Sequence, residues 1–174
     1  MGRSAGWTET LAAGLLAGVA ATAAMDGYWR VMKRVRPLPA RGDEPAPSRV
    51  AADLLRRSGF GNPNRRARHT GGQALHWAYG MGWGIAAAAA RRAGFRLDIG
   101  LGQPLGAALE LGGDLGGMDA LGYARHPREY PPNVIAQAFG GHAVYGAALW
   151  ASLEAWDRVR HGRRGGRLRW PRAA

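Results

Sequence analysis

Residues 75–90, LHWAYGMGWGIAAAAA, contain no Asp, Glu, Lys or Arg, and they carry the motif HWAYG at 76–80. A matching motif, HAVYG at 142–146, lies in a second uncharged run, residues 134–152. In each motif the His, Tyr and Gly lie at i, i+3 and i+4, which places them on one face of a helix. The two runs therefore predict two equivalent helices, each with a polar motif in an apolar sequence.

A second repeated element, the dipeptide Met-Asp, precedes each motif. Met25-Asp26 comes before the first motif, and Met118-Asp119 comes before the second. The repeated order predicts a duplicated two-helix unit with an ionisable residue in each helix. Charge inside an apolar helix is costly, so these positions are the first candidates for function.

The charges are strongly basic and unevenly distributed. The chain has 24 Lys and Arg against 12 Asp and Glu, with a net charge of +12. Thr10 to Met25 carries no charge, whereas 30–68, 91–96 and 158–172 are rich in Arg. Apolar runs separated by basic connectors are typical of multi-span membrane proteins. The chain has no cysteine, which excludes disulfides, thiolate metal sites and cysteine nucleophiles.

These patterns predict an all-α, membrane-embedded four-helix bundle with one helical domain, residues 1–157. The connector at 33–71 is rich in Pro and Arg, and a short amphipathic helix is expected within it at 49–58. A basic tail follows at 158–174. The expected membrane spans are residues 7–32, 72–93, 99–123 and 133–156.

The third expected span is the most polar one. It contains Glu110, Asp114 and Asp119, and each acid costs about 2.5–3.5 kcal/mol at the centre of a membrane helix. The positive-inside rule favours three spans, whereas the duplication favours four helices. A third helix that is re-entrant or only partly inserted satisfies both.

Small residues form a stripe along the first and third segments. Gly14, Gly18, Thr22 and Asp26 follow one another at i+4, and Gly102, Gly106, Glu110 and Asp114 do the same. Such stripes allow helices to approach closely in a membrane. The predicted packing positions are Gly14, Gly18, Gly80 and Gly146.

The polar residues inside the apolar runs form the candidate site. The first candidates are His76, His142, Asp26 and Asp119, the second are Glu110 and Asp114, and Tyr79 and Tyr145 lie beside the histidines. The simplest interpretation is that they form hydrogen bonds between helices. They are also suited to relay protons, to hold a divalent metal, or to ligate a haem iron through two imidazoles. No catalytic residue and no resident cofactor is predicted.

The basic tail predicts a lipid-binding segment. Each charge next to an anionic membrane surface contributes about 1 kcal/mol. A soluble nucleic-acid-binding protein is the alternative from another class, but the segregation of Arg away from the apolar runs argues against it, and no nucleic-acid partner is expected. A homo-oligomer is compatible with this fold. The residues assigned to lipid contact are Arg158, Arg160, Arg163, Arg164, Arg167 and Arg169.

Motifs of the familiar enzyme classes, including a phosphate-binding Walker loop, an HExxH zinc helix and a GxSxG elbow, are missing from the sequence. The Gly-rich first segment ending near Met25-Asp26, the two His-x-x-Tyr-Gly motifs, the Gly- and Asp-rich third segment and Pro131-Pro132 together resemble the YagU-type family of small bacterial inner-membrane proteins. The resemblance implies a four-helix, multi-pass protein of the bacterial inner membrane, with a non-enzymatic role in the envelope or in acid stress. It implies no catalytic residues.

Overall fold

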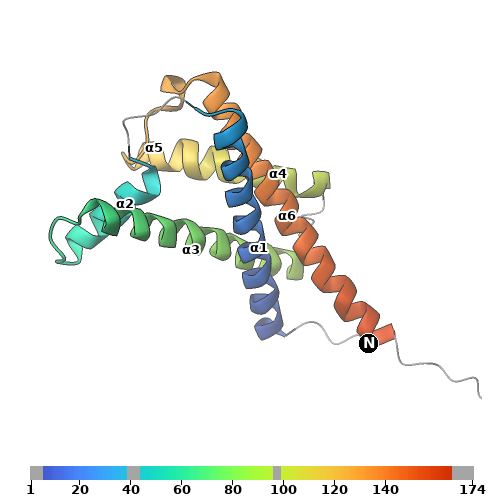
Figure 1. The fold of residues 1–174 in the computed structure, drawn as a ribbon. Helices are drawn as coiled ribbons and strands as arrows, with labels where there is room; N and C mark the ends of the chain where they lie inside the picture. Colours follow the sequence, from blue (N-terminus) through green and yellow to red (C-terminus); the bar gives the residue numbers. More distant parts are fainter. Residues whose placement is uncertain (1–5, 39–43, 96–98, 166–174) are drawn as a thin grey trace, which may run out of the picture.

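The computed structural model describes residues 6–38, 44–95 and 99–165, of which the side chains of residues 161–165 are not described. All regular structure in these residues is helical, and none of them lies in a β-strand. The predicted all-α fold is therefore confirmed for this part of the chain. The elements are α1 (Trp7–Val35), α2 (Ala46–Arg57), α3 (Arg65–Arg92), η1 (Ile99–Gly102), α4 (Gln103–Leu109), η2 (Glu110–Gly117), α5 (Met118–Ala120), η3 (Pro127–Glu129) and α6 (Pro132–Gly165) (Figure 1).

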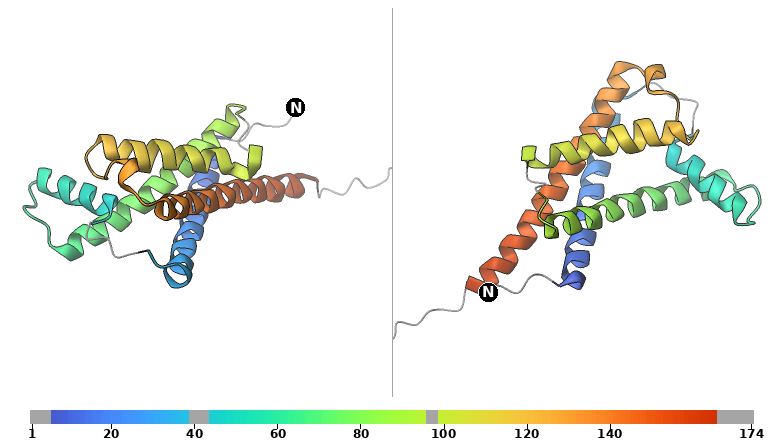
Figure 2. Two further views of the ribbon diagram at one scale, coloured as in Figure 1. Left: turned by 90° about the horizontal axis from the view of Figure 1, so that it is seen from above. Right: turned by 180° about the vertical axis from the view of Figure 1, so that it is seen from behind.

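Two pairs of helical segments make up the fold. α1 packs against α3, and α4 packs against α6. α1 also packs against α6 and so connects the two pairs, while α2 lies against α3. Within each pair the segments cross, with α3 lying across α1 and the α4–α5 segment lying across α6 (Figure 2). The described segments therefore pack as two crossed pairs, joined by the contact of α1 with α6.

Glycine allows α1 and α3 to touch through their backbones. A Cβ atom added to Gly14 would lie 2.6 Å from the Ile85 Cα atom, and one added to Gly84 would lie 2.3 Å from the Gly14 carbonyl oxygen. A Cβ atom on Gly18 would meet the Gly80 carbonyl oxygen at 2.8 Å. Real Cβ atoms do not approach other atoms this closely, so only glycine fits at this crossing.

The α4–α6 crossing is built in the same way. A Cβ atom on Gly106 would lie 2.3 Å from the His142 carbonyl oxygen, and one on Gly146 would lie 2.4 Å from the Gly102 carbonyl oxygen. Gly102 also adopts a positive φ of 79°, a conformation that a side chain would strain. Small residues thus set the separation of both pairs.

The third predicted span is not one continuous α-helix. Residues 99–102 form a 3₁₀ turn, a short α-helix follows, and Glu110–Gly117 is π-helical. The sequence of the π segment, ELGGDLGG, is half glycine, and glycine is a weak helix former. π-Helical turns are rare and occur frequently at functional sites.

The connector helix begins earlier than expected. α2 starts at Ala46 after Pro45, rather than at residue 49, and Pro47 lies in its first turn, where proline is tolerated. Asn64 caps the start of α3 by accepting a hydrogen bond of 2.9 Å from the Ala67 backbone N–H. Local chemistry therefore defines the starts of α2 and α3, both of which lie within the predicted connector.

Among the described residues, α1 is the one helix that is both long enough and apolar enough to cross a membrane. α3 and α6 contain 28 and 34 residues, so they have the length but not the apolar composition. A core helix of a soluble protein and a signal sequence can share the properties of α1. The four membrane spans therefore remain a prediction.

Candidate functional site

The two crossed pairs share one pattern of residues. Gly18, Thr22 and Asp26 of α1 lie against Gly80 and His76 of the first motif, and Gly14 lies against Gly84 and Ile85 one turn beyond it. Gly102 lies against Gly146 of the second motif, and Gly106, Glu110 and Asp114 lie against His142. In both pairs two glycines touch the partner helix, and the aspartate at the end of the stripe faces the histidine of the motif. The two crossed pairs therefore bring similar residue types together, and the duplication itself stays a prediction.

The first pair holds His76 against Asp26. The His76 Nε2 atom lies 3.2 Å from the Asp26 Oδ1 atom, and the two side chains are 25% and 19% exposed. Thr22, one turn before Asp26, is buried and donates its hydroxyl proton to the Gly18 carbonyl oxygen at 2.8 Å. His76 and Asp26 therefore pair in a partly exposed position, while the Thr22 hydroxyl is satisfied within α1.

The second pair holds His142 between two carboxylates. The His142 Nδ1 atom lies 2.7 Å from the Glu110 Oε2 atom, and its Nε2 atom lies 3.7 Å from the Asp114 Oδ2 atom. The Nδ1 atom also lies 3.1 Å from the Ala138 carbonyl oxygen. A carbonyl oxygen can only accept, so Nδ1 carries a proton and Nε2 faces Asp114.

Glu110 is the most unusual residue of this cluster. It is 1% exposed, and its Oε2 atom receives no hydrogen bond from any residue that the structure describes. The short distance to Nδ1 does not supply one, because the ring N–H meets the hydrogen-bond geometry for the Ala138 oxygen instead. A buried carboxylate oxygen without a donor is costly unless it binds a proton or a cation.

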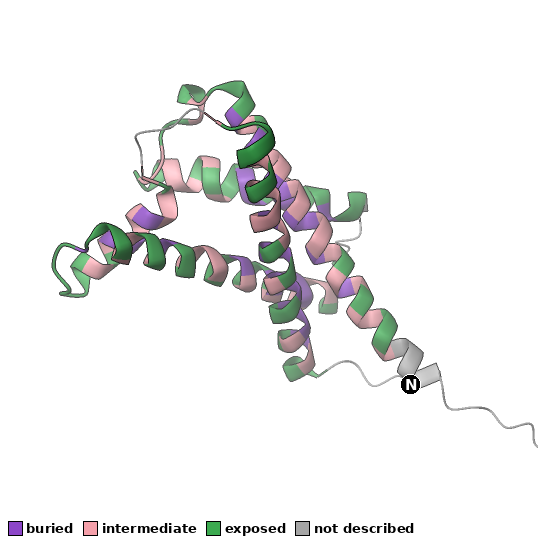
Figure 3. Ribbon diagram, viewed as in Figure 1, coloured by how far each residue is buried: buried purple, intermediate pink, exposed green. Residues whose placement is uncertain are grey.

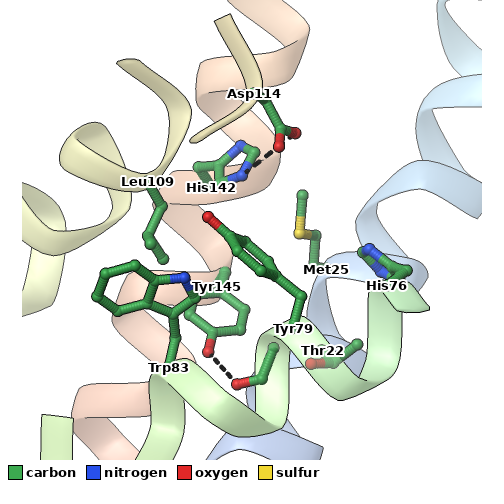
Figure 4. A pocket seen from close by; sticks show the side chains of 10 residues that line it. Thr22, Met25, His76, Tyr79, Trp83, Leu109, Asp114, His142 and Tyr145 are labelled. Carbon is green, nitrogen blue, oxygen red and sulfur yellow. Dashed lines mark hydrogen bonds and ion pairs between the residues drawn. The ribbon is translucent and has the colours of Figure 1, made fainter. Parts of the chain in front are cut away.

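The tyrosines of the two motifs take different positions. Tyr145 is buried and donates a hydrogen bond of 2.6 Å to the Gly80 carbonyl oxygen, which ties α6 to α3. Tyr79 is 40% exposed and packs edge-on against Trp83. Its ring lies between the two imidazoles in the view of Figure 4.

Both histidines line one small cavity. Its volume is about 40 Å³, which is room for a few water molecules at most. Asp114 and the two tyrosines reach the same cavity (Figure 4). The lining residues are Thr22, Met25, His76, Tyr79, Gly80, Trp83, Leu109, Asp114, His142 and Tyr145.

A much larger groove begins on the other side of Glu110 and Asp114. It has a volume of about 540 Å³ and runs between the end of α1, α2, η2 and the start of α6. Glu110 and Asp114 form part of its wall, and apolar side chains such as Leu115 and Met118 form much of the rest. The second carboxylate–histidine cluster therefore separates a wide groove from a narrow cavity.

Asp119 differs from its predicted position. It lies in α5, is partly exposed, and no hydrogen bond or ion pair joins its carboxylate to another described residue. Asp114 takes the place opposite His142 that corresponds to Asp26 opposite His76. The carboxylate that faces His142 therefore belongs to the i+4 stripe and not to the repeated Met-Asp dipeptide.

The basic tail is described only at its start. Arg158 is exposed, and Arg160 forms an ion pair with Glu9 at the start of α1. Arg163 and Arg164 belong to α6, but their side chains are outside the described residues, as are Arg167 and Arg169 altogether. An interaction that the sequence analysis did not find lies nearby, where Arg91 bonds Glu154 at 2.7 Å and Asp157 at 2.9 Å.

No protein-family model matches this chain, and neither a curated protein nor a solved structure matches it at a significant level. The inferences about function below therefore depend on the residues of this chain alone.

Proposed function

We propose that this chain is a helical protein of the bacterial inner membrane that relays protons between its two histidine–carboxylate pairs. The observation that carries the proposal is the shared cavity, because His76, His142 and Asp114 all line it. Imidazole is the side chain best suited to take up and release protons near neutral pH. A cavity with room for a few waters supplies the links between them.

The relay has an opening at each end. Asp114 is 52% exposed and, with Glu110, meets the wide groove, so protons can reach His142 from there. On the other side His76 and Asp26 are 25% and 19% exposed and form the second opening. Tyr79 lies in the cavity between the imidazoles and can accept and donate a hydrogen bond. The polar groups thus form a series from one surface to the other.

The distribution of side-chain size supports a membrane location. Alanine makes up half of the buried apolar cluster, whereas large apolar residues of α1, among them Trp7, Leu15 and Leu16, are exposed. Exposed positions recur along α1 (Figure 3). Membrane helices pack through small residues and place large apolar ones against lipid. Exposed large apolar side chains along a helix are unfavourable in water unless something covers them. The Arg-rich tail next to α6 suits anionic headgroups at the membrane surface.

A haem protein is the less favoured alternative. The cavity between the histidines, at about 40 Å³, is far smaller than a porphyrin, and each imidazole already faces a carboxylate. A proton relay agrees with the acid-stress role that the resemblance to the YagU-type family implies, and that resemblance stays a prediction.

Membrane insertion is tested first. We expect the protein to stay in the membrane pellet through washes with alkaline carbonate and high salt, and to be released by detergent. Release by carbonate would show that the helices do not span, and the membrane part of the proposal would fall.

Proton movement is tested in sealed vesicles with a pH-sensitive dye inside. An imposed potential drives protons through the purified protein, with a chelator present throughout. We expect His142→Gln and His76→Gln each to lower the flux by about tenfold or more, because each removes one proton-carrying group. His69→Gln is the control, since His69 is exposed at the start of α3 and away from the cavity. Full flux in both site variants would overturn the relay.

A further inference from the structure

The second histidine–carboxylate cluster has the composition of a metal site. Glu110, Asp114 and His142 each offer one ligand atom, and these atoms lie within 4.8 Å of one another. Around a tetrahedral ion with bonds of about 2.1 Å the ligand atoms are about 3.4 Å apart, so the carboxylates must rotate toward the His142 Nε2 atom to enclose one ion. Asp114 has the freedom to make most of that movement because its side chain is 52% exposed.

An independent feature of Glu110 points to a ligand. Its Oε2 atom is buried and without a hydrogen-bond donor among the described residues, although it lies 2.7 Å from the imidazole of His142. Buried carboxylates in proteins are usually paired with another group or coordinate a metal ion. A bound cation would supply the charge that the surroundings of Glu110 do not.

The remaining nitrogen of His142 has a suitable orientation. Its Nδ1 proton is directed to the Ala138 carbonyl oxygen, which fixes the ring and its tautomer. The Nε2 atom then presents its lone pair toward Asp114, 3.7 Å away. A backbone carbonyl that orients a ligating imidazole is a common partner in metal sites.

The wide groove supplies a route for the ion. Glu110 and Asp114 form part of the wall of this space of about 540 Å³, so a hydrated cation can reach the exposed Asp114 carboxylate from it, next to the buried Glu110. The small cavity on the other side leaves room for the waters that complete the coordination.

The described residues of the first half contain no such cluster. Thr22 stands at the position that corresponds to Glu110, and its hydroxyl already donates to the Gly18 carbonyl oxygen. His76 and Asp26 alone provide two ligands rather than three. Variants of the His76–Asp26 pair can therefore serve as controls for variants of the Glu110, Asp114 and His142 cluster.

We propose that Glu110, Asp114 and His142 bind one divalent transition-metal ion through one imidazole nitrogen and two carboxylate oxygens. This donor set suits Zn²⁺, Mn²⁺ or Fe²⁺ better than the soft ion Cu⁺, which prefers sulfur ligands. The inference goes beyond the proton relay and does not require it, because an ion can bind whether or not protons move.

The test measures binding of Zn²⁺ and Mn²⁺ to the full chain in a mild detergent, purified with a tag that contains no histidine and stripped with a chelator. Calorimetry gives the affinity, and elemental analysis after dialysis gives the number of ions. We expect about one ion per chain and affinities at least about tenfold lower in Asp114→Asn, Glu110→Gln and His142→Gln. The matched variants Asp26→Asn and His76→Gln should bind as the unaltered protein does.

Asp114→Asn is the deciding variant, because its half-exposed side chain can be changed without loss of the fold. The metal site would be overturned if Asp114→Asn bound the ion as tightly as the unaltered protein. It would also be overturned if Asp26→Asn lost as much metal affinity as Asp114→Asn. Binding is measured at equilibrium in detergent, and proton flux is measured in vesicles with a chelator present. Either proposal can therefore fail while the other holds.

Discussion

The two halves of this molecule pack their helices in a similar way but differ in the polar residues that this packing brings together. In each, a helix with glycines four residues apart crosses a helix with a His-x-x-Tyr-Gly motif, and an aspartate faces the histidine. In the first half α1 is a regular helix, and the Thr22 hydroxyl donates a hydrogen bond to the Gly18 carbonyl oxygen of the same helix. In the second half the corresponding residue is Glu110, and the helix around it is π-helical. The comparison teaches that the shared glycines determine packing, while Glu110 in place of threonine and a distorted helix bring two carboxylates to one histidine.

The largest expected effect separates the two histidines. His142→Ala removes the imidazole that lies 2.7 Å from the buried carboxylate of Glu110 and leaves that carboxylate unpaired, which should cost about 3–5 kcal/mol of unfolding free energy. His76→Ala removes a partner from the better exposed Asp26 and should cost about 1 kcal/mol or less. Thermal unfolding in detergent measures both.

A double variant sharpens this comparison. Adding Glu110→Gln to His142→Ala should recover part of the lost stability, because a neutral amide is cheaper to bury than an unpaired carboxylate. Equal stability of His142→Ala and His76→Ala would show that the two pairs do not differ in burial as described.

The glycine crossings give the next largest effect. Gly84→Val would force side-chain atoms into the Gly14 carbonyl and should destabilise the fold by about 1–3 kcal/mol. Gly82→Val is the matched control on the same helix, because a Cβ atom there meets nothing within 4 Å. Similar melting temperatures for both variants would contradict the close approach of α1 and α3.

The two tyrosines should differ by a smaller amount. Tyr145→Phe leaves the buried Gly80 carbonyl oxygen without its 2.6 Å hydrogen bond and should cost about 1–2 kcal/mol. Tyr79→Phe, at a position that is 40% exposed, should cost about 0.5 kcal/mol or less. A larger loss for Tyr79→Phe would reverse the roles assigned to them.

The smallest effect concerns the connectors of the two halves. Asp53 of α2 accepts a hydrogen bond of 2.7 Å from the Tyr123 hydroxyl, which holds the pKa of Asp53 below its ordinary value, and Arg57 and Arg56 act in the same direction. Because the pKa of Asp53 is lower in the folded state, its ionised carboxylate stabilises the fold at pH values above the unfolded-state pKa of 3.8. This contribution is lost as the pH falls through the folded-state pKa. Stability should therefore fall less steeply on acidification in Asp53→Asn than in the unaltered protein, and parallel pH profiles would refute this.

Some features of the site could be predicted from the sequence. The uncharged runs predicted helices, and the i+4 glycine stripes marked the faces that meet. The sequence could not show which aspartate faces His142, because Asp119 belongs to the repeated Met-Asp dipeptide and Asp114 belongs to the i+4 stripe. Residues five apart on a helix lie on different faces, so choosing between them requires knowing which face is covered.

Other features had no local signal at all. The π-helical turn at Glu110–Gly117 replaces the continuous helix expected there, and a run rich in glycine does not specify which hydrogen-bond pattern forms. The start of α2 at Ala46 rather than residue 49 follows from a proline in the first turn, a position where the sequence permits a helix without requiring one.

The sequence by itself determined the helical class, the duplicated motif and the small-residue faces, because these depend on periodicities over a few turns of one helix. Only the tertiary structure decided that Asp114 rather than Asp119 faces His142, that Glu110 is buried without a donor, and that both histidines reach one cavity. These properties depend on how segments far apart in the chain cross, and the packing of whole helices determines that crossing.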